Sequence, residues 1–167
     1  MSELTRTCVK IRFHKLTDAR HDLEVLRQGH ASERVACETR SYLAHDLLHY
    51  ATESEARLDG GFYGRLAAGC TLAELNDRTK PAMNAPEMAL IEQIVGMLSG
   101  SVKGHTPEQM MAVFERFTTA SERELPPWLT ADFVARVQER MRQLQGHFRA
   151  TAFGSYMELD WPASLCP

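Results

Sequence analysis

Hydrophobic and polar residues alternate along the first forty positions, which is the pattern of half-buried β-strands. In the first segment the apolar side holds Val9, Ile11 and Phe13. Turn residues at 17–19 and at 28–30 separate it from two more alternating segments, at 21–27 and 35–40. Residues 1–40 therefore predict a three-stranded antiparallel meander. Its histidines are expected to be exposed strand or turn residues: His14, His21 and His30.

From residue 41 onward the apolar positions recur every three or four residues, as they do in helices. Residues 41–77 predict one long helix and two short ones, the last opened by a capping box between Thr71 and Glu74. The prolines within 78–86 predict a surface connection. Over 86–150 we expect three helices: one capped by Asn84, one capped by Thr106, and one from Thr130 onward. Renewed alternation over 155–161 predicts a strand that returns to the sheet.

The last long helix carries a narrow apolar seam, consisting of Val134, Val137, Met141, Leu144 and Phe148. The helix before it offers a matching stripe, consisting of Met110, Val113, Phe114 and Phe117. We expect these two helices to pack antiparallel along the seam. Because the seam covers only about two heptads, it is predicted to be buried within the chain and not between two chains.

These patterns predict an α+β fold in which an antiparallel sheet of three or four strands carries about five helices. A length of 167 residues, with 44% hydrophobic and 25% charged residues, suits one domain with a single core. We therefore expect a single domain over 1–167, made of a meander at 1–40, helices at 41–77, a helical part at 86–150 and a return strand at 155–161.

Charge and cysteine usage narrow the classes of partner and compartment. The net charge of −3 and the pI near 6.2 disfavour nucleic-acid binding. The apolar runs are too short to cross a membrane. The four scattered cysteines and an amino terminus without a signal-peptide pattern predict reduced thiols in a cytoplasmic protein. The cysteines are Cys8, Cys37, Cys70 and Cys166. The sequence leaves a homo-oligomer and any small-molecule substrate open.

The segment 41–53 combines a helical pattern with clustered ligand-type side chains. His45, His49 and Glu53 form a stripe opposite the apolar face, and Asp46 flanks it. Two imidazoles at i and i+4 lie about 6 Å apart and can converge on one ion. We therefore predict that His45 and His49 bind Zn²⁺ or another divalent transition metal. Asp46 and Glu53 are expected to be further ligands or partners of the imidazoles.

The two carboxylates of this segment differ in what they can reach. Glu53 lies about 12 Å along the helix from His45, so it suits a hydrogen bond to His49 better than a shared ion. Asp46 could orient an imidazole or act on a bound water, which makes it a candidate catalytic residue. The alternative is a hydrogen-bonded His/Asp/Glu network without an ion, in a non-catalytic helical interaction or structural protein. The stripe's place opposite the core favours a site, because a structural role is less needed there.

Two resemblances involve the same segment. His45-Asp46-Leu47-Leu48-His49 resembles the His-Glu-x-x-His helix of zinc metallopeptidases, with aspartate in place of glutamate, and Glu74 follows at a distance such enzymes sometimes use. That resemblance implies a zinc-dependent hydrolase, although aspartate is one methylene shorter than the usual general base.

Residues 35–70 also resemble a family of small uncharacterised bacterial proteins with a His-Asp-Leu-x-His-aromatic-x-x-Glu segment. The resemblance rests on His45-Asp46-Leu47, Glu53, Gly61-Phe62-Tyr63-Gly64 and Ala67-Ala68-Gly69. It implies a cytoplasmic bacterial protein and no particular activity. Whether the chain is an enzyme is therefore undecided by its sequence.

Overall fold

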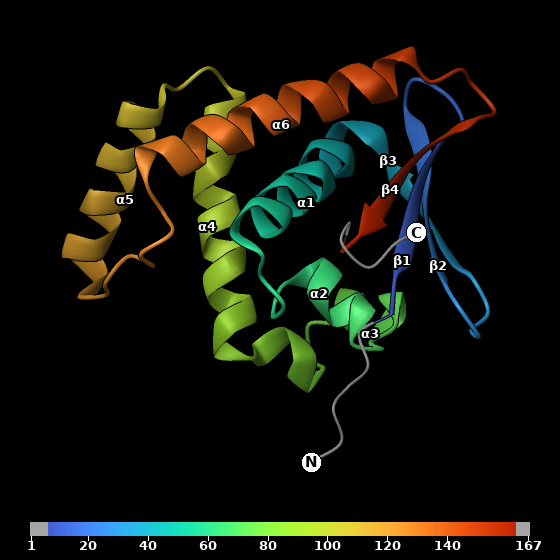
Figure 1. The fold of residues 1–167 in the computed structure, drawn as a ribbon, viewed down its shortest axis with the longest axis horizontal. Coiled ribbons are helices and arrows are strands. Elements are labelled where there is room, and N and C mark those ends of the chain that lie inside the picture. Colours follow the sequence, from blue (N-terminus) through green and yellow to red (C-terminus); the bar gives the residue numbers. More distant parts are fainter. Residues whose placement is uncertain (1–6, 163–167) are drawn as a thin grey trace.

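The computed structural model describes residues 7–162, in which helices cover one face of a four-stranded antiparallel sheet (Figure 1). The strands are β1 (Val9–Lys15), β2 (Arg20–Arg27), β3 (Glu33–Glu38) and β4 (Tyr156–Trp161). Their order across the sheet is β3-β2-β1-β4, so the last strand pairs with the first. The predicted α+β class, the meander and the return strand are confirmed.

The inner face of the sheet is apolar because the alternation places every second residue against the helices. Phe13 lies opposite Leu23 on β2 and opposite Met157 on β4, and all three are buried. The outer face carries charged pairs such as Arg12 with Glu158, whose Nε and Oε2 atoms lie 2.7 Å apart. The expectation that His21 is exposed is wrong: it shares the inner face with Leu23 and is 0% exposed.

The helices follow in chain order with two irregular turns among them. A π-helical turn, η1 (Thr39–Leu43), leads into α1 (Ala44–Ala56), and a 3₁₀ turn, η2 (Pro81–Asn84), precedes α4. The remaining helices are α2 (Phe62–Ala67), α3 (Leu72–Asn76), α4 (Pro86–Val102), α5 (Pro107–Ser121) and α6 (Ala131–Ala150). The predicted capping box at Thr71 is present, and the predicted cap at Thr106 is part of a second one. Asn84, however, ends η2, and α4 begins at Pro86, a position that proline favours.

Helix α6 buries its predicted seam inside the chain, from Val134 to Phe148. The prediction that α5 is the partner of this seam is wrong for its main contact: α6 runs alongside α1 and packs less extensively on α5 and α4 (Figure 1). The stripe on α5 is only partly used: Met110 and Phe114 are buried, but Val113 and Phe117 are half-buried. Helix α1 therefore lies at the centre of the helical layer.

A partly buried ion pair ties the short helices to the sheet. Arg27, at the end of β2, pairs with Glu33 on β3 and donates to the carbonyl oxygens of Leu66 and Cys70 at 3.2 and 2.7 Å. Glu33 in turn accepts a hydrogen bond from the main-chain N–H of Leu72, at 2.8 Å. These contacts fix the ends of α2 and α3 against the strands.

The cysteines differ from the prediction of four reduced thiols. Cys8 is disulfide-bonded, whereas Cys37 and Cys70 are free, and Cys166 lies outside the described residues. Disulfides persist in oxidising environments, so the cytoplasmic expectation loses the reduced-thiol argument on which it rested. Within residues 7–162, no helix has both the length and the apolar character needed to cross a membrane.

Candidate metal centre

Three metal-ligating side chains converge between α1 and α4. His45 and His49 come from successive turns of α1, and Glu92 comes from α4, which packs beside it. One ligand atom from each residue lies within 4.8 Å of the other two. The two imidazole rings stand edge to face with their centroids 4.7 Å apart. His45 is exposed and His49 is buried, so the cluster opens to solvent on the His45 side.

Glu53 holds the buried imidazole of His49 in place. The Nδ1 atom of His49 lies 3.0 Å from Oε1 of Glu53, so the hydrogen bond expected from their i, i+4 spacing is present. Glu53 is fully buried and also accepts the main-chain N–H groups of Phe62 and Tyr63, at 2.8 and 3.0 Å. Its carboxylate therefore joins α1 to the first turn of α2 and leaves Nε2 of His49 directed at Glu92.

The expectation that this polar stripe lies off the core is wrong for two of its members. His49 is 3% exposed and Glu53 is 0% exposed. The reason is that α1 is covered on more than one side: α6 packs on it, and α2 and α4 cover the stripe. Periodicity distinguishes a polar face from an apolar one, but it does not reveal that another helix will cover the polar face.

Gly61 makes the close approach of Glu53 to α2 feasible. A Cβ atom at Gly61 would overlap the carboxyl group of Glu53. Gly61 has φ −84°, which any residue can adopt, so the requirement is for space and not for backbone freedom.

The charges of the cluster favour an imidazolium between two carboxylates when no ion is bound. Burial alone would lower the pKa of His49, but the hydrogen bond to Glu53 and the contact with Glu92 raise it to about 9. Burial opposes ionisation of Glu92, yet His49 lowers its pKa below the usual value. Burial and the neighbouring His49 lower the pKa of His45, which leaves that imidazole neutral.

The donor set fits a divalent transition metal. Two imidazole nitrogens and one carboxylate oxygen form a common ligand set for Zn²⁺ and non-haem Fe²⁺, with remaining positions for water. Nε2 of His49 lies 3.1 Å from Oε1 of Glu92, yet within the described part of the chain this nitrogen makes no hydrogen bond of acceptable geometry. The donors around tetrahedral zinc lie about 3.4 Å apart, so small side-chain rotations would bring these three into range.

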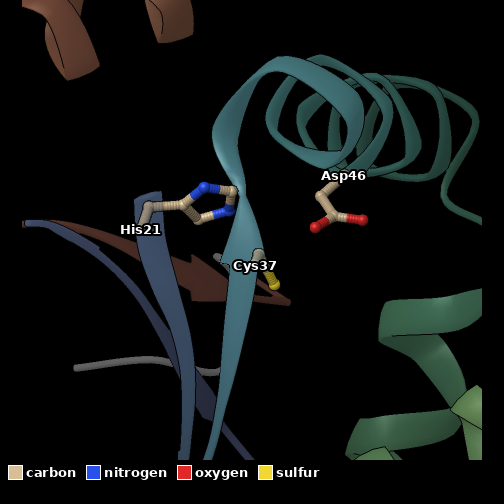
Figure 2. A group of neighbouring side chains, drawn as sticks. All are labelled: His21, Cys37 and Asp46. Atoms are coloured by element: carbon tan, nitrogen blue, oxygen red, sulfur yellow. The ribbon is translucent and has the colours of Figure 1, made fainter. Parts of the chain in front are cut away.

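Asp46 belongs to a different group of ligand atoms. Its ligand atom lies within 4.8 Å of those of His21 on β2 and Cys37 on β3, as Figure 2 illustrates. Burial, opposed by the charge of His49, raises the pKa of Asp46 to about 7. The hydroxyl of Tyr63 donates to the main-chain oxygen of Asp46 at 2.9 Å. Asp46 therefore belongs to another cluster, and the geometry does not support a catalytic role for it at an ion held by His45 and His49.

Glu92 is not among the ligands predicted from the sequence, although the pattern of its helix marks it as unusual. Between Pro86 and Val102 only Glu87 and Glu92 are charged. Glu87 lies in the first turn of α4, where a carboxylate is favoured by the helix dipole. Glu92 lies in the middle of an apolar helix and has no such explanation. Glu74, by contrast, is engaged in its capping box, as predicted.

Comparisons with family models, with curated proteins and with solved structures found no significant match for this chain. The resemblances to zinc metallopeptidases and to a family of small bacterial proteins therefore remain expectations, and the site is interpreted from its own geometry.

Proposed function

We propose that this protein binds a divalent transition-metal ion through His45, His49 and Glu92. The observation that carries the proposal is the third donor: Glu92 reaches the two histidines from a separate helix, and its Oε1 lies 3.1 Å from Nε2 of His49. Two imidazoles alone would leave a tetrahedral ion half coordinated. The exposed edge at His45 gives an ion and a small ligand access from solvent.

Glu53 would act on the ion only through His49. A metal-bound histidine commonly donates its other ring N–H to a carboxylate, which fixes the ring and makes the ligating nitrogen more basic. The Nδ1 to Oε1 hydrogen bond at 3.0 Å supplies that arrangement here. Metal binding must displace the proton that His49 holds between the two carboxylates, so affinity should rise with pH.

A second candidate is a structural network without an ion. It is favoured by the fact that Glu53 already satisfies three donors, from His49, Phe62 and Tyr63. In this alternative the protein is a non-catalytic interaction module, and His49 with its carboxylates serves to join α1, α2 and α4. Hydrolytic chemistry at the ion is a further step for which no substrate-binding feature is assigned.

Calorimetric titration of metal-free protein with Zn²⁺ separates the first two candidates. We expect one equivalent to bind at this site, with binding weakened at least 10-fold in His45→Ala and in Glu92→Gln. Glu87→Gln makes the same chemical change on the same helix outside the cluster and should bind like the wild type. If the three variants and the wild type bind Zn²⁺ alike, or none binds it, the structural network is the better explanation.

A further inference from the structure

A second cluster of three different donor types lies where β2 and β3 meet the start of α1 (Figure 2). His21 and Cys37 face each other directly in the β2–β3 register, and Asp46 projects toward them from α1. One ligand atom of each residue lies within 4.8 Å of the other two. Two strands and the helix that follows them thus bring a nitrogen, a sulfur and an oxygen to one point.

The side chain of His21 independently indicates a ligand site at this cluster. Its side chain is 0% exposed, and its Nδ1 atom lies 3.1 Å from the hydroxyl oxygen of Thr39. Its Nε2 atom is buried without a hydrogen-bond partner among residues 7–162. Figure 2 shows the ring edge that carries this nitrogen turned toward Cys37 and Asp46. A buried polar nitrogen left unpaired destabilises the fold, and a bound ligand would remove that penalty.

The other two donors are available for a ligand. Cys37 is a free thiol whose sulfur lies 3.8 Å from the carbonyl oxygen of Val35, a weak contact. The hydrogen bond from Tyr63 to Asp46 uses the main-chain oxygen of Asp46 and leaves its carboxyl group directed at the cluster.

We infer that His21, Cys37 and Asp46 form a second metal site, for Zn²⁺ or a similar thiophilic divalent ion, separate from the centre at His45. Thiolate and imidazole ligands favour zinc over magnesium, calcium or manganese. On binding, the thiol of Cys37 loses its proton to solvent and its sulfur bonds the ion. Donors around tetrahedral zinc lie about 3.3 to 3.8 Å apart, so modest rotations suffice, and a water takes the fourth position.

Such an ion would link both strands to the helix that carries the first centre. His45 and Asp46 are consecutive residues, so the start of α1 would contribute one ligand to each ion. The inference does not depend on the centre at His45, because none of its three donors belongs to that centre.

Cobalt substitution tests the site because a thiolate bound to Co²⁺ gives an intense charge-transfer band in the near ultraviolet, and nitrogen and oxygen ligands do not. In titrations of the metal-free full chain with Co²⁺, we expect this band in the wild type, in Cys70→Ser and in Glu92→Gln, and its loss in Cys37→Ser. Cys70→Ser is the matched control, because Cys70 is the other free thiol of the described chain. Absence of the band from the wild type, or its persistence in Cys37→Ser, would overturn the inference.

Alkylation provides a readout that does not require Cys37→Ser to fold. In the Cys70→Ser protein we expect Zn²⁺ to slow alkylation of Cys37 at least 10-fold, and an unchanged rate contradicts the site. A buried water on Nε2 of His21 would also satisfy that atom, but it would give neither band nor protection. Unchanged Zn²⁺ binding in Glu92→Gln, together with a cobalt band that only Cys37→Ser removes, would overturn the centre at His45 alone, so the two proposals fail separately.

Discussion

Nε2 of His49 lies 3.1 Å from Oε1 of Glu92, although the two residues come from different helices, α1 and α4. Replacing the carboxylate by an amide, in Glu92→Gln, keeps the size but removes the charge that faces the imidazole. We expect the variant to remain folded and the pKa of His49 to fall below about 9. NMR titration of the His49 ring in metal-free protein measures this directly. An unchanged pKa would show that the charge of Glu92 does not stabilise the imidazolium of His49.

Glu53→Gln should be strongly destabilising. The amide group cannot accept all three hydrogen bonds that the carboxylate receives, and its NH₂ group must face a donor. Breaking a buried charged pair costs about 3 to 5 kcal/mol, measured here as the free energy of unfolding in urea. Glu55→Gln is the matched control two residues away, where the ion pair with Arg136 is partly exposed and should contribute at most about 1 kcal/mol. Equal effects of the two substitutions would contradict the buried role of Glu53.

Gly61→Ala should destabilise the protein, because the added Cβ overlaps the Glu53 carboxyl group. Overpacking of this kind typically costs about 1 to 3 kcal/mol. Gly96→Ala offers a contrast: Gly96 lies in the interior of α4, and a Cβ there meets nothing within 4 Å. That change should stabilise the helix by roughly 0.5 to 1 kcal/mol. Thermal unfolding of both variants checks the opposite signs, and a stabilised Gly61→Ala protein would refute the close approach.

The metal-free protein should lose stability as the pH rises. The folded-state pKa of His49 is raised to about 9, so its contribution is complete below its ordinary value of 6.5 and is lost as the pH passes about 9. The folded-state pKa of Asp46 is raised from 3.8 to about 7, so the neutral acid stabilises the fold at low pH and this contribution is lost by about pH 7. Both groups act in the same direction, so their losses of stability add.

The free energy of unfolding in urea, measured between about pH 5 and pH 9.5 with chelator present, separates the pH range of Asp46 from that of His49. Asp46→Asn should flatten the lower part of the profile and His49→Gln the upper part. A wild-type stability that is constant or rising over this range would contradict both assignments.

The burial of Met141 predicts a fifth outcome. Met141 is 3% exposed and belongs to the seam of α6, which packs on α1. Met141→Ala should cost about 2 to 5 kcal/mol through lost transfer energy and a cavity, while Met97→Ala, at a half-buried site on α4, should cost less. Met141→Asp should unfold the protein. Sedimentation of both proteins tests this. If the wild type is a dimer and Met141→Asp is a folded monomer, the seam joins two chains.

The sheet and the threonine caps could be predicted from sequence because both depend on local patterns. Alternation placed Val9, Ile11 and Phe13 on one face, and the Thr71 capping box is complete within four residues. The site could be predicted only in part. His45, His49 and Glu53 share one helix, so their spacing was visible in the sequence. The lone charge in an apolar helix marks Glu92, but its contact with the histidines arises from the packing of two helices, which no local pattern reports.

The errors at His21 and at the polar stripe have one physical origin. Residue type predicts exposure on average, whereas burial at a given position depends on what covers it. His21 lies on the inner face between Phe13 and Phe148, whose rings are 6.2 and 6.1 Å from its own. The packing partner of α6 was predicted wrongly for a related reason. The apolar stripe on α5 matches the seam of α6, but in the fold α6 packs mainly on α1.

Helix α1 is buried without interruption from Leu47 to Glu53, and this has a consequence for how the chain can change over generations. An ordinary surface helix offers a free position on every turn, where substitutions accumulate without effect. Here seven consecutive positions are all buried. Few substitutions should therefore be tolerated in this segment, and more should be tolerated on the exposed faces of α5 and of the sheet.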